Sequence, residues 1–400
     1  MIKLKKETFV KAIYIMFCVS FLLKIYNNSR TGITGGTHGG IWNLSTIIIF
    51  VITIALVINL NKIRLDMILV LGLVFLLITV VNSFVTAKEF TFSFFYNVSI
   101  IPYFIFLIIL FALLAKIQIN IEETFRVYIV CFFILSIFLF FNQLLEMGVS
   151  SEFYVVTDVY YLLNMLPFVL LCKKPSIRYV SIGVVAVLLI ISGKRTGFIA
   201  FCVGVLLFFI IESIVNSTSR NDNKRIIITF LAVLILVVAL FLILSFVFKL
   251  TFFQRIIYAF SNGESGRQKI WGRTISSLKD SSIVELIFGH GIRSVPELLN
   301  SKNALAHCDF LEIVYDFGIF ALIFLVAFYV GLIIKTIQLI VSKNQYASSF
   351  TFCIVILLFM SIFSNYIIEA TYATYNMITI GYILGATTNW ENMYGYFKSS

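Results

Sequence analysis

Runs of apolar residues close to twenty long recur along the whole chain of 400 residues. A helix of that length crosses the hydrocarbon core of a bilayer, and a helix satisfies its own backbone hydrogen bonds in lipid. Sixty per cent of the residues are apolar, whereas only 12% are charged, about half the share in an average soluble domain. The sequence therefore predicts an all-α polytopic integral membrane protein in which residues 1–400 form a single membrane domain.

Length and hydropathy place about twelve transmembrane helices in the chain. They are expected at residues 9–26, 42–60, 66–87, 96–116, 125–145, 155–172, 177–192, 196–215, 226–248, 310–334, 348–368 and 371–388. The last stretch, "TYATYNMITIGYILGATT", is polar enough to be re-entrant instead. No small-residue cleavage site follows the first apolar run, so this run is interpreted as a retained span and not as a signal peptide.

Lysine and arginine are distributed unevenly between the two sets of short loops. One set holds 15 of them, and the opposite set holds four, Arg30, Lys88, Lys194 and Arg195. The first set comprises residues 1–8, 59–65, 116–124, 172–178, 216–225, 335–347 and 389–400. Because short loops rich in Lys and Arg stay in the cytoplasm, both termini are expected inside and the second set outside.

Two adjacent cations, Lys194 and Arg195, stand between two apolar runs in "IISGKRTGFIA" on the expected outer side. They could be hairpin residues that only extend their charges to the lipid headgroups. They could instead form an anion site, because Gly193 would let the backbone approach a ligand and the next helix would add its N-terminal dipole. The anion site is favoured, since the positive-inside rule disfavours cations on this face.

One large extracytoplasmic loop, residues 249–308, is expected between transmembrane helices 9 and 10. It carries eight cations against four acids. A basic surface beside the membrane indicates an anionic ligand that is presented from the membrane plane. The net charge of +11 is otherwise mostly due to inside loops that meet anionic lipid, so it requires no nucleic acid as a partner.

A short amphipathic helix is expected in the loop segment "ESGRQKIWGRTISSLKD". Its apolar stripe recurs at i, i+4 and i+7 and consists of Trp271, Ile275 and Leu278. Arg267 lies four residues before this stripe and is expected to point inward, whereas Lys269 and Arg273 fall on the opposite face. A buried cation needs an anionic partner, which could be a ligand or one of the acids of the loop.

The three histidines have different surroundings. His38 and His290 lie among glycines, in "TGGTHGG" and "FGHGI", and are interpreted as loop or turn residues. His307 directly precedes the expected tenth span, and three acids follow it on one helix face: Asp309, Glu312 and Asp316. Asp309 is also a candidate N-cap, and Asp316, at a depth of about 10 Å, would need a partner or a water-filled cavity. His307 could be only an interfacial residue, but cations above and acids below are typical of a polar cavity that opens outward.

These pieces together resemble the O-antigen polymerase and O-antigen ligase superfamily, which includes capsule and exopolysaccharide polymerases. The resemblance rests on "SGKRTGFIAF", "SGRQKIW", "FGHGI" and "AHCDFLEIVYDFGIFALI", on their order and on their placement in a multi-span scaffold. It covers roughly residues 150–335. Family members often have His-Asn where this chain has His307-Cys308, which leaves the local hydrogen bonding at Cys308 open.

The resemblance implies a fold similar to the C-type integral-membrane glycosyltransferases and a site at the outer face of the bacterial cytoplasmic (inner) membrane. The donor and acceptor would be glycans carried on undecaprenyl pyrophosphate, with membrane lipid and a chain-length regulator as further partners and with neither a cofactor nor a metal. Arg195 and Arg267 match the arginines that hold the pyrophosphate, with Lys194 beside them, and His307 matches the proposed catalytic base. The candidate supporting residues are Asp309, Glu312, Arg273 and Arg293.

The predicted function is therefore polymerisation of lipid-linked repeat units by an inverting, metal-independent glycosyl transfer. An O-antigen ligase, which moves finished polymer onto lipid A core, would use the same donor chemistry and is the first alternative. A lipid-linked oligosaccharide flippase is an alternative from another class. A transporter would be expected to show halves related by a repeat and broken polar helices near the midplane, and the sequence has no visible internal repeat.

Overall fold

The structure is a computed structural model that describes residues 66–116, 121–149, 158–216, 266–300, 305–368 and 373–387. Every regular element in these ranges is a helix, which confirms the predicted all-α class. The helices are α3 (Met67–Thr86), α4 (Phe92–Lys116), α5 (Ile121–Val149), α6 (Val159–Val169), α7 (Pro175–Ile191), α8 (Arg195–Val215), α11 (Gly266–Asp280), α12 (Ile283–Phe288), α13 (Ser294–Leu298), α14 (Asp309–Val341), α15 (Ala347–Phe363) and α16 (Thr374–Thr387). The predicted spans at 9–26, 42–60 and 226–248 lie outside the described residues, as do His38 and residues 249–265 of the large loop.

Three described helices, α3, α8 and α14, are long and apolar enough to cross a membrane, which supports the prediction of a helical membrane protein. Each of the predicted spans that falls on described residues coincides with one helix. The agreement is close at α8, which was expected at 196–215 and begins at Arg195. The total of twelve spans and the position of the termini stay predictions.

The last helix, α16, packs tightly against α4 through two glycines four residues apart. A Cβ atom on Gly381 would collide with the backbone of Ile108, and one on Gly385 would collide with the backbone of Ala112. Small residues at this spacing let two helix backbones approach closely in a membrane. The described part of α16, which stops where the described residues end, has 14 residues and a length of roughly 21 Å, whereas the hydrocarbon core is about 30 Å thick. The alternative of a re-entrant segment is therefore still open for this stretch.

The long helix α14 bends at Gly318, where φ is 80° and the backbone leaves the helical region. The carbonyl groups just before the bend accept hydrogen bonds from outside the helix. The pairs are His290 N–H to Tyr315 O (2.9 Å), Gly291 N–H to Asp316 O (3.0 Å) and Asn82 Nδ2 to Phe317 O (2.6 Å). A break in a membrane helix is tolerated where protein satisfies its backbone in this way. After the bend, residues 319–341 are roughly 34 Å long and could cross the membrane by themselves.

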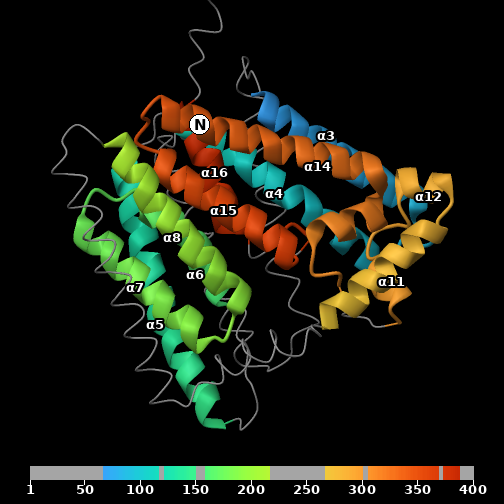
Figure 1. Cartoon of the computed structure of the whole chain (residues 1–400), viewed down its shortest axis with the longest axis horizontal. Coiled ribbons are helices and arrows are strands. Elements are labelled where there is room, and N and C mark those ends of the chain that lie inside the picture. Colours follow the sequence, from blue (N-terminus) through green and yellow to red (C-terminus); the bar gives the residue numbers. More distant parts are fainter. Residues whose placement is uncertain are drawn as a thin grey trace, which may run out of the picture.

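The helices of the large loop gather at one end of the bundle, where α11 and α12 lie against α14 (Figure 1). At this end Lys88, in the turn after α3, pairs with Glu297 of α13 at 3.2 Å. Elsewhere one guanidinium nitrogen of Arg178 of α7, Nη2, donates to both carboxylate oxygens of Glu212 of α8, at 2.6 Å each. Lys88 and the large loop were both predicted outside, whereas residues 172–178 and the end of α8 were predicted inside. These contacts therefore join segments that were assigned to the same side.

Candidate functional site

The turn between α7 and α8 presents the two adjacent cations. Gly193 has a φ of 65°, a left-handed conformation that ends α7, and Lys194 precedes the first residue of α8, Arg195. The freedom of Gly193 is thus used to reverse the chain at this turn. The N-terminus of α8, with its partial positive charge, lies directly at the cations, as the anion-site interpretation requires.

Helix α11 is fixed by two side chains that bond to the backbone of later segments. Trp271 Nε1 donates to the carbonyl of Ala306 at 2.6 Å, and Arg267 Nη1 donates to the carbonyl of Phe363, at the end of α15, at 2.6 Å. Arg267 is half-buried, whereas Lys269 and Arg273 are exposed. The predicted inward orientation of Arg267 is therefore confirmed.

The predicted apolar stripe of α11 is wrong at one position. Ile275 is 45% exposed, whereas Thr274 beside it is fully buried and Ile270 packs on the small core cluster formed by Val295, Ala306 and Tyr315. The buried face is rotated toward residues 267, 270, 271, 274 and 278. The predicted stripe matched this face at Trp271 and Leu278 and missed Ile270, and the polar Thr274 gave no apolar signal.

His307 lies in a left-handed turn, with φ at 53°, directly before α14. Burial lowers the pKa of its imidazole, and the charges of Arg267 and Lys194 lower it further. Burial also lowers the pKa of Arg267, with Arg195 acting in the same direction and Tyr160 against it. These interactions show that the structure brings Lys194, Arg195, Arg267 and His307 together, although up to 113 positions separate them in the sequence.

Tyr160 of α6 belongs to the same group and was not found from the sequence. The ammonium of Lys194 lies 5.4 Å from the centroid of the Tyr160 ring, and this ring packs on Gly197 so closely that a Cβ there would collide with it. A cation over an aromatic face is attracted by the ring, so Tyr160 holds Lys194 in place. In the sequence Tyr160 is one aromatic residue within an apolar run, and no local pattern distinguishes it.

The three acids of α14 were expected to lie below His307 at a polar cavity that opens outward, whereas in the structure their oxygens accept hydrogen bonds mainly from backbone N–H groups. Asp309 accepts the N–H groups of Tyr366 and Ile367, both at 2.9 Å. Glu312 Oε2 accepts the N–H of Ala306 at 2.7 Å, one residue before the histidine. Within the described residues, none of the three carboxylates is hydrogen-bonded to the imidazole. The expectation failed because a buried carboxylate accepts hydrogen bonds from unpaired backbone N–H groups as readily as from a histidine.

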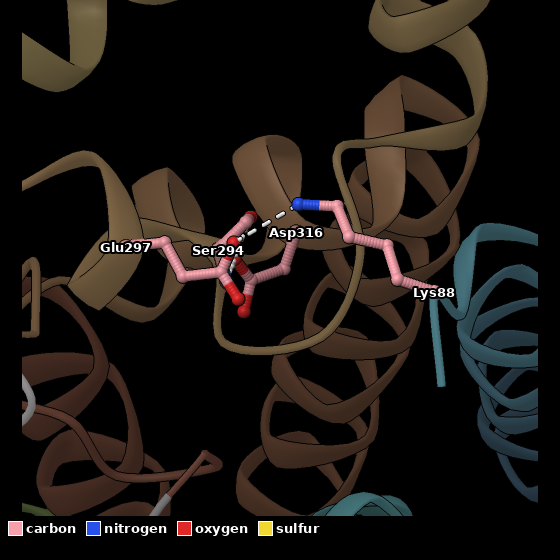
Figure 2. A network of polar contacts seen from close by, with 4 residues as sticks. All are labelled: Lys88, Ser294, Glu297 and Asp316. Atoms are coloured by element: carbon pink, nitrogen blue, oxygen red, sulfur yellow. Dashed lines mark hydrogen bonds and ion pairs between the residues drawn. The ribbon is translucent and has the colours of Figure 1, made fainter. Parts of the chain in front are cut away.

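Asp316 fixes the part of the large loop at the start of α13 (Figure 2). Its oxygens accept the N–H of Arg293 at 2.8 Å and both the N–H and the hydroxyl of Ser294, at 3.1 and 2.7 Å. The depth of 10 Å expected for Asp316 assumed one straight helix from 310 to 334, and the bend at Gly318 separates this residue from the spanning part. Arg293, a candidate supporting residue, takes part through its backbone, in a left-handed conformation with φ at 59°.

His290 is a turn residue, as predicted, because Gly289 and Gly291, with φ of 82° and 107°, reverse the chain on both sides of it. The sequence did not indicate that the ring of His290 makes specific contacts with other side chains and with the backbone. It stacks on Tyr315 at a centroid distance of 4.2 Å, and its two nitrogens lie 3.1 Å from the Tyr315 carbonyl and 3.0 Å from the Ser281 hydroxyl. The glycines of "FGHGI" and "DFGIF" are the sequence signal that could have indicated this contact of His290 with Tyr315. A Cβ atom on Gly289 would collide with the backbone of Asp316, and one on Gly318 would collide with the backbone of Ile287, so both glycines are needed for the two segments to approach.

Among the described residues, no group of three or more His, Cys, Asp or Glu side chains is arranged to hold a metal ion. The arrangement at this end is instead a half-buried group of three cations beside a histidine. Two of the cations are arginines, whose planar fork suits phosphate oxygens. The site could hold an anionic phosphate ester next to a group that can accept a proton.

Comparison with known families adds to this geometry. The family described as O-Antigen ligase matches residues 180–326, a range that contains Lys194, Arg195, Arg267 and His307. The predicted relationship to the O-antigen ligase and polymerase superfamily is confirmed. The match supports a ligase-type or polymerase-type activity in bacterial surface-polysaccharide biosynthesis, in the inner membrane, and it does not distinguish the two activities. No curated protein matches the chain.

Proposed function

We propose that this protein polymerises undecaprenyl-pyrophosphate-linked oligosaccharide repeat units at the outer face of the bacterial cytoplasmic membrane. The observation that carries the proposal is the convergence of Arg195, Arg267 and Lys194 on His307, within the region that matches the O-antigen ligase family. Within the described residues, Arg267 has no carboxylate partner; of the loop acids, Glu285 caps α12, Glu297 pairs with Lys88, and Glu264 lies outside the described residues. This observation favours a ligand over a structural ion pair as its anion.

The cations would bind the pyrophosphate of the donor. Negative charge builds on the pyrophosphate as the bond between the anomeric carbon and the phosphate oxygen breaks, and cations that are already in place stabilise that transition state. The Arg267 guanidinium is held by the Phe363 carbonyl, and the Lys194 ammonium is held over the Tyr160 ring. Both are therefore oriented before the donor arrives, which lowers the cost of binding it.

His307 would act as the general base. The hydroxyl of the acceptor sugar attacks the anomeric carbon, its proton moves to the imidazole, and the pyrophosphate leaves with the electron pair of the broken bond. Direct displacement of this kind inverts the anomeric centre. The lowered pKa of His307 favours the neutral ring, which is the state in which it can accept a proton.

Transfer of finished polymer onto lipid A core is the second candidate function, because it needs the same donor site and the family match includes it. No observation in the structure or the comparisons supports the flippase. Purified protein with lipid-linked repeat units in detergent micelles separates the three possibilities, since micelles offer no second compartment. Longer glycans on the lipid carrier would support the polymerase. Transfer only after addition of lipid A core would identify a ligase, and an unchanged substrate would contradict both.

A further inference from the structure

Helix α12 exposes nearly all of its apolar side chains. The exposed fractions are 74% for Ile283, 60% for Val284, 37% for Leu286 and 44% for Phe288, and none of its six residues is buried. The helix is nevertheless well fixed, because Ser282 and Glu285 form a capping box at its start and Gly289 ends it. Apart from Glu285, whose carboxylate accepts the N–H of Ser282 at the start of the helix, the exposed side chains of α12 are all apolar, and such a surface is usually covered by something other than water.

The position of α12 indicates what covers it. The backbone of Ile287 lies against Gly318, the residue at which α14 bends. Beyond the bend, exposed apolar side chains follow one face of α14 at helical spacing: Ile319, Ile323, Val326, Val330, Ile333 and Ile337. A spanning helix turns such a face toward lipid. The apolar surface of α12 therefore adjoins the first turn of a surface that faces the bilayer.

A second such surface ends at the same place. Helix α3, another candidate span, exposes Leu77, Val81 and Phe84 along one face, and its last residue, Thr86, lies beside Gly291. Phe84 and the nearby Phe90 pack together at a centroid distance of 6.1 Å. The turn 289–291 that follows α12 thus meets the ends of both α3 and the spanning part of α14 (Figure 1).

We propose that α12 is an interfacial helix whose apolar side chains insert among the acyl chains of the outer leaflet. Continuity with two lipid-facing helices selects lipid as the occupant over a second copy of the chain or another protein. An apolar helix held at the end of a membrane span lies at the boundary between headgroups and acyl chains, where interfacial helices bind. The inference concerns the bilayer and does not depend on the reaction that the site performs.

Spin-label accessibility tests this directly. In the full chain, with its native cysteines replaced by alanine, a nitroxide is placed by Phe288→Cys and the protein is reconstituted into phospholipid nanodiscs. Collisions with oxygen, which concentrates in the acyl region, are compared with collisions with a water-soluble nickel chelate. Phe320→Cys, on the exposed face of α14, is the lipid reference, and Ser276→Cys, on the exposed face of α11, is the aqueous reference.

The ratio of oxygen to nickel collisions at residue 288 should be severalfold higher than at residue 276 and should approach the value at residue 320. A ratio equal to that at residue 276 would place α12 in water and overturn the proposal. Low accessibility to both reagents would also overturn it, because the helix would then be covered by protein. All three positions are exposed in the structure, so the labels should not disturb folding, and an identical elution profile for the three proteins checks this.

Discussion

The carboxylates and the cations at the end of the bundle that carries the large loop are held in opposite ways. Asp309 and Asp316 are fully buried, and their oxygens are occupied by backbone N–H groups of segments far away in the sequence. Lys194, Arg195 and Arg267 are half-buried, and they gather at a histidine although like charges repel. The carboxylates thus hold the loop in place, whereas the cations are grouped at an energetic cost that an anionic ligand would remove.

The largest effect is expected from removing a carboxylate. Asp316→Ala leaves three hydrogen-bond donors of Arg293 and Ser294 without their acceptor, at about 1–3 kcal/mol for each buried donor. The variant should lose most of its folded protein, which thermal unfolding followed by size-exclusion chromatography would show. Asp280→Ala, at an exposed position of α11, is the control and should behave like the unsubstituted chain. A fully stable but inactive Asp316→Ala would mean that this carboxylate acts in the site.

His307→Ala should leave the fold intact and abolish most of the activity. Loss of a general base slows the chemical step by roughly a hundred-fold or more, while donor binding should stay near normal. Glycan elongation on the lipid carrier measures the first, and titration with labelled donor measures the second. Near-normal elongation would require another base.

Replacing either arginine by lysine keeps the charge and removes the planar fork. Arg195→Lys and Arg267→Lys should each lower the rate by about ten-fold, the equivalent of about 1.4 kcal/mol, if each guanidinium holds the pyrophosphate with two bonds. The same elongation assay measures this, at expression levels matched to the unsubstituted chain. Full activity in both variants would exclude bidentate recognition.

The acid limb of the pH profile should move when one cation is removed. His307 must be neutral to act, and its pKa is held below the ordinary value by burial, by Arg267 and by Lys194. Lys194→Met removes one of these charges, so the pKa of His307 should rise and activity should begin to fall at a higher pH on acidification. The rate is measured between about pH 5 and 8, where histidines titrate. The position of the limb is compared, not its height, since Lys194 is also expected to touch the donor.

The smallest effect is expected at the face of α11 that turns away from the site. Arg273 is exposed, so Arg273→Ala should change the elongation rate by less than about two-fold, within the ±0.5 kcal/mol usual for surface substitutions. This variant is the matched control for Arg267→Lys, because both residues lie on one helix and differ in the face they occupy. An equal loss in both would mean that α11 contributes only its total charge.

Much of the scaffold follows from local patterns, and the site only in part. Apolar runs gave the bounds of α8 to within one residue, because the free energy of burial is a sum over neighbouring positions. The inward orientation of Arg267 followed from helical spacing alone. Tyr160 and the bend at Gly318 could not be predicted in this way, since each depends on a segment more than 20 positions away. The roles of the acids were missed for the same reason, because their partners are backbone groups that carry no signature in the sequence.

The partners that fix Arg267 and Asp309 have a consequence for how the protein is made. Arg267 bonds to a carbonyl 96 positions later in the chain, and Asp309 bonds to N–H groups 57 and 58 positions later. At a synthesis rate of about 5–20 residues per second, the interval for Arg267 is roughly 5–20 s. During this time α11 has been made and the end of α15 has not. A chain interrupted after α14 would therefore lack both the carbonyl that fixes Arg267 and the N–H groups that fix Asp309.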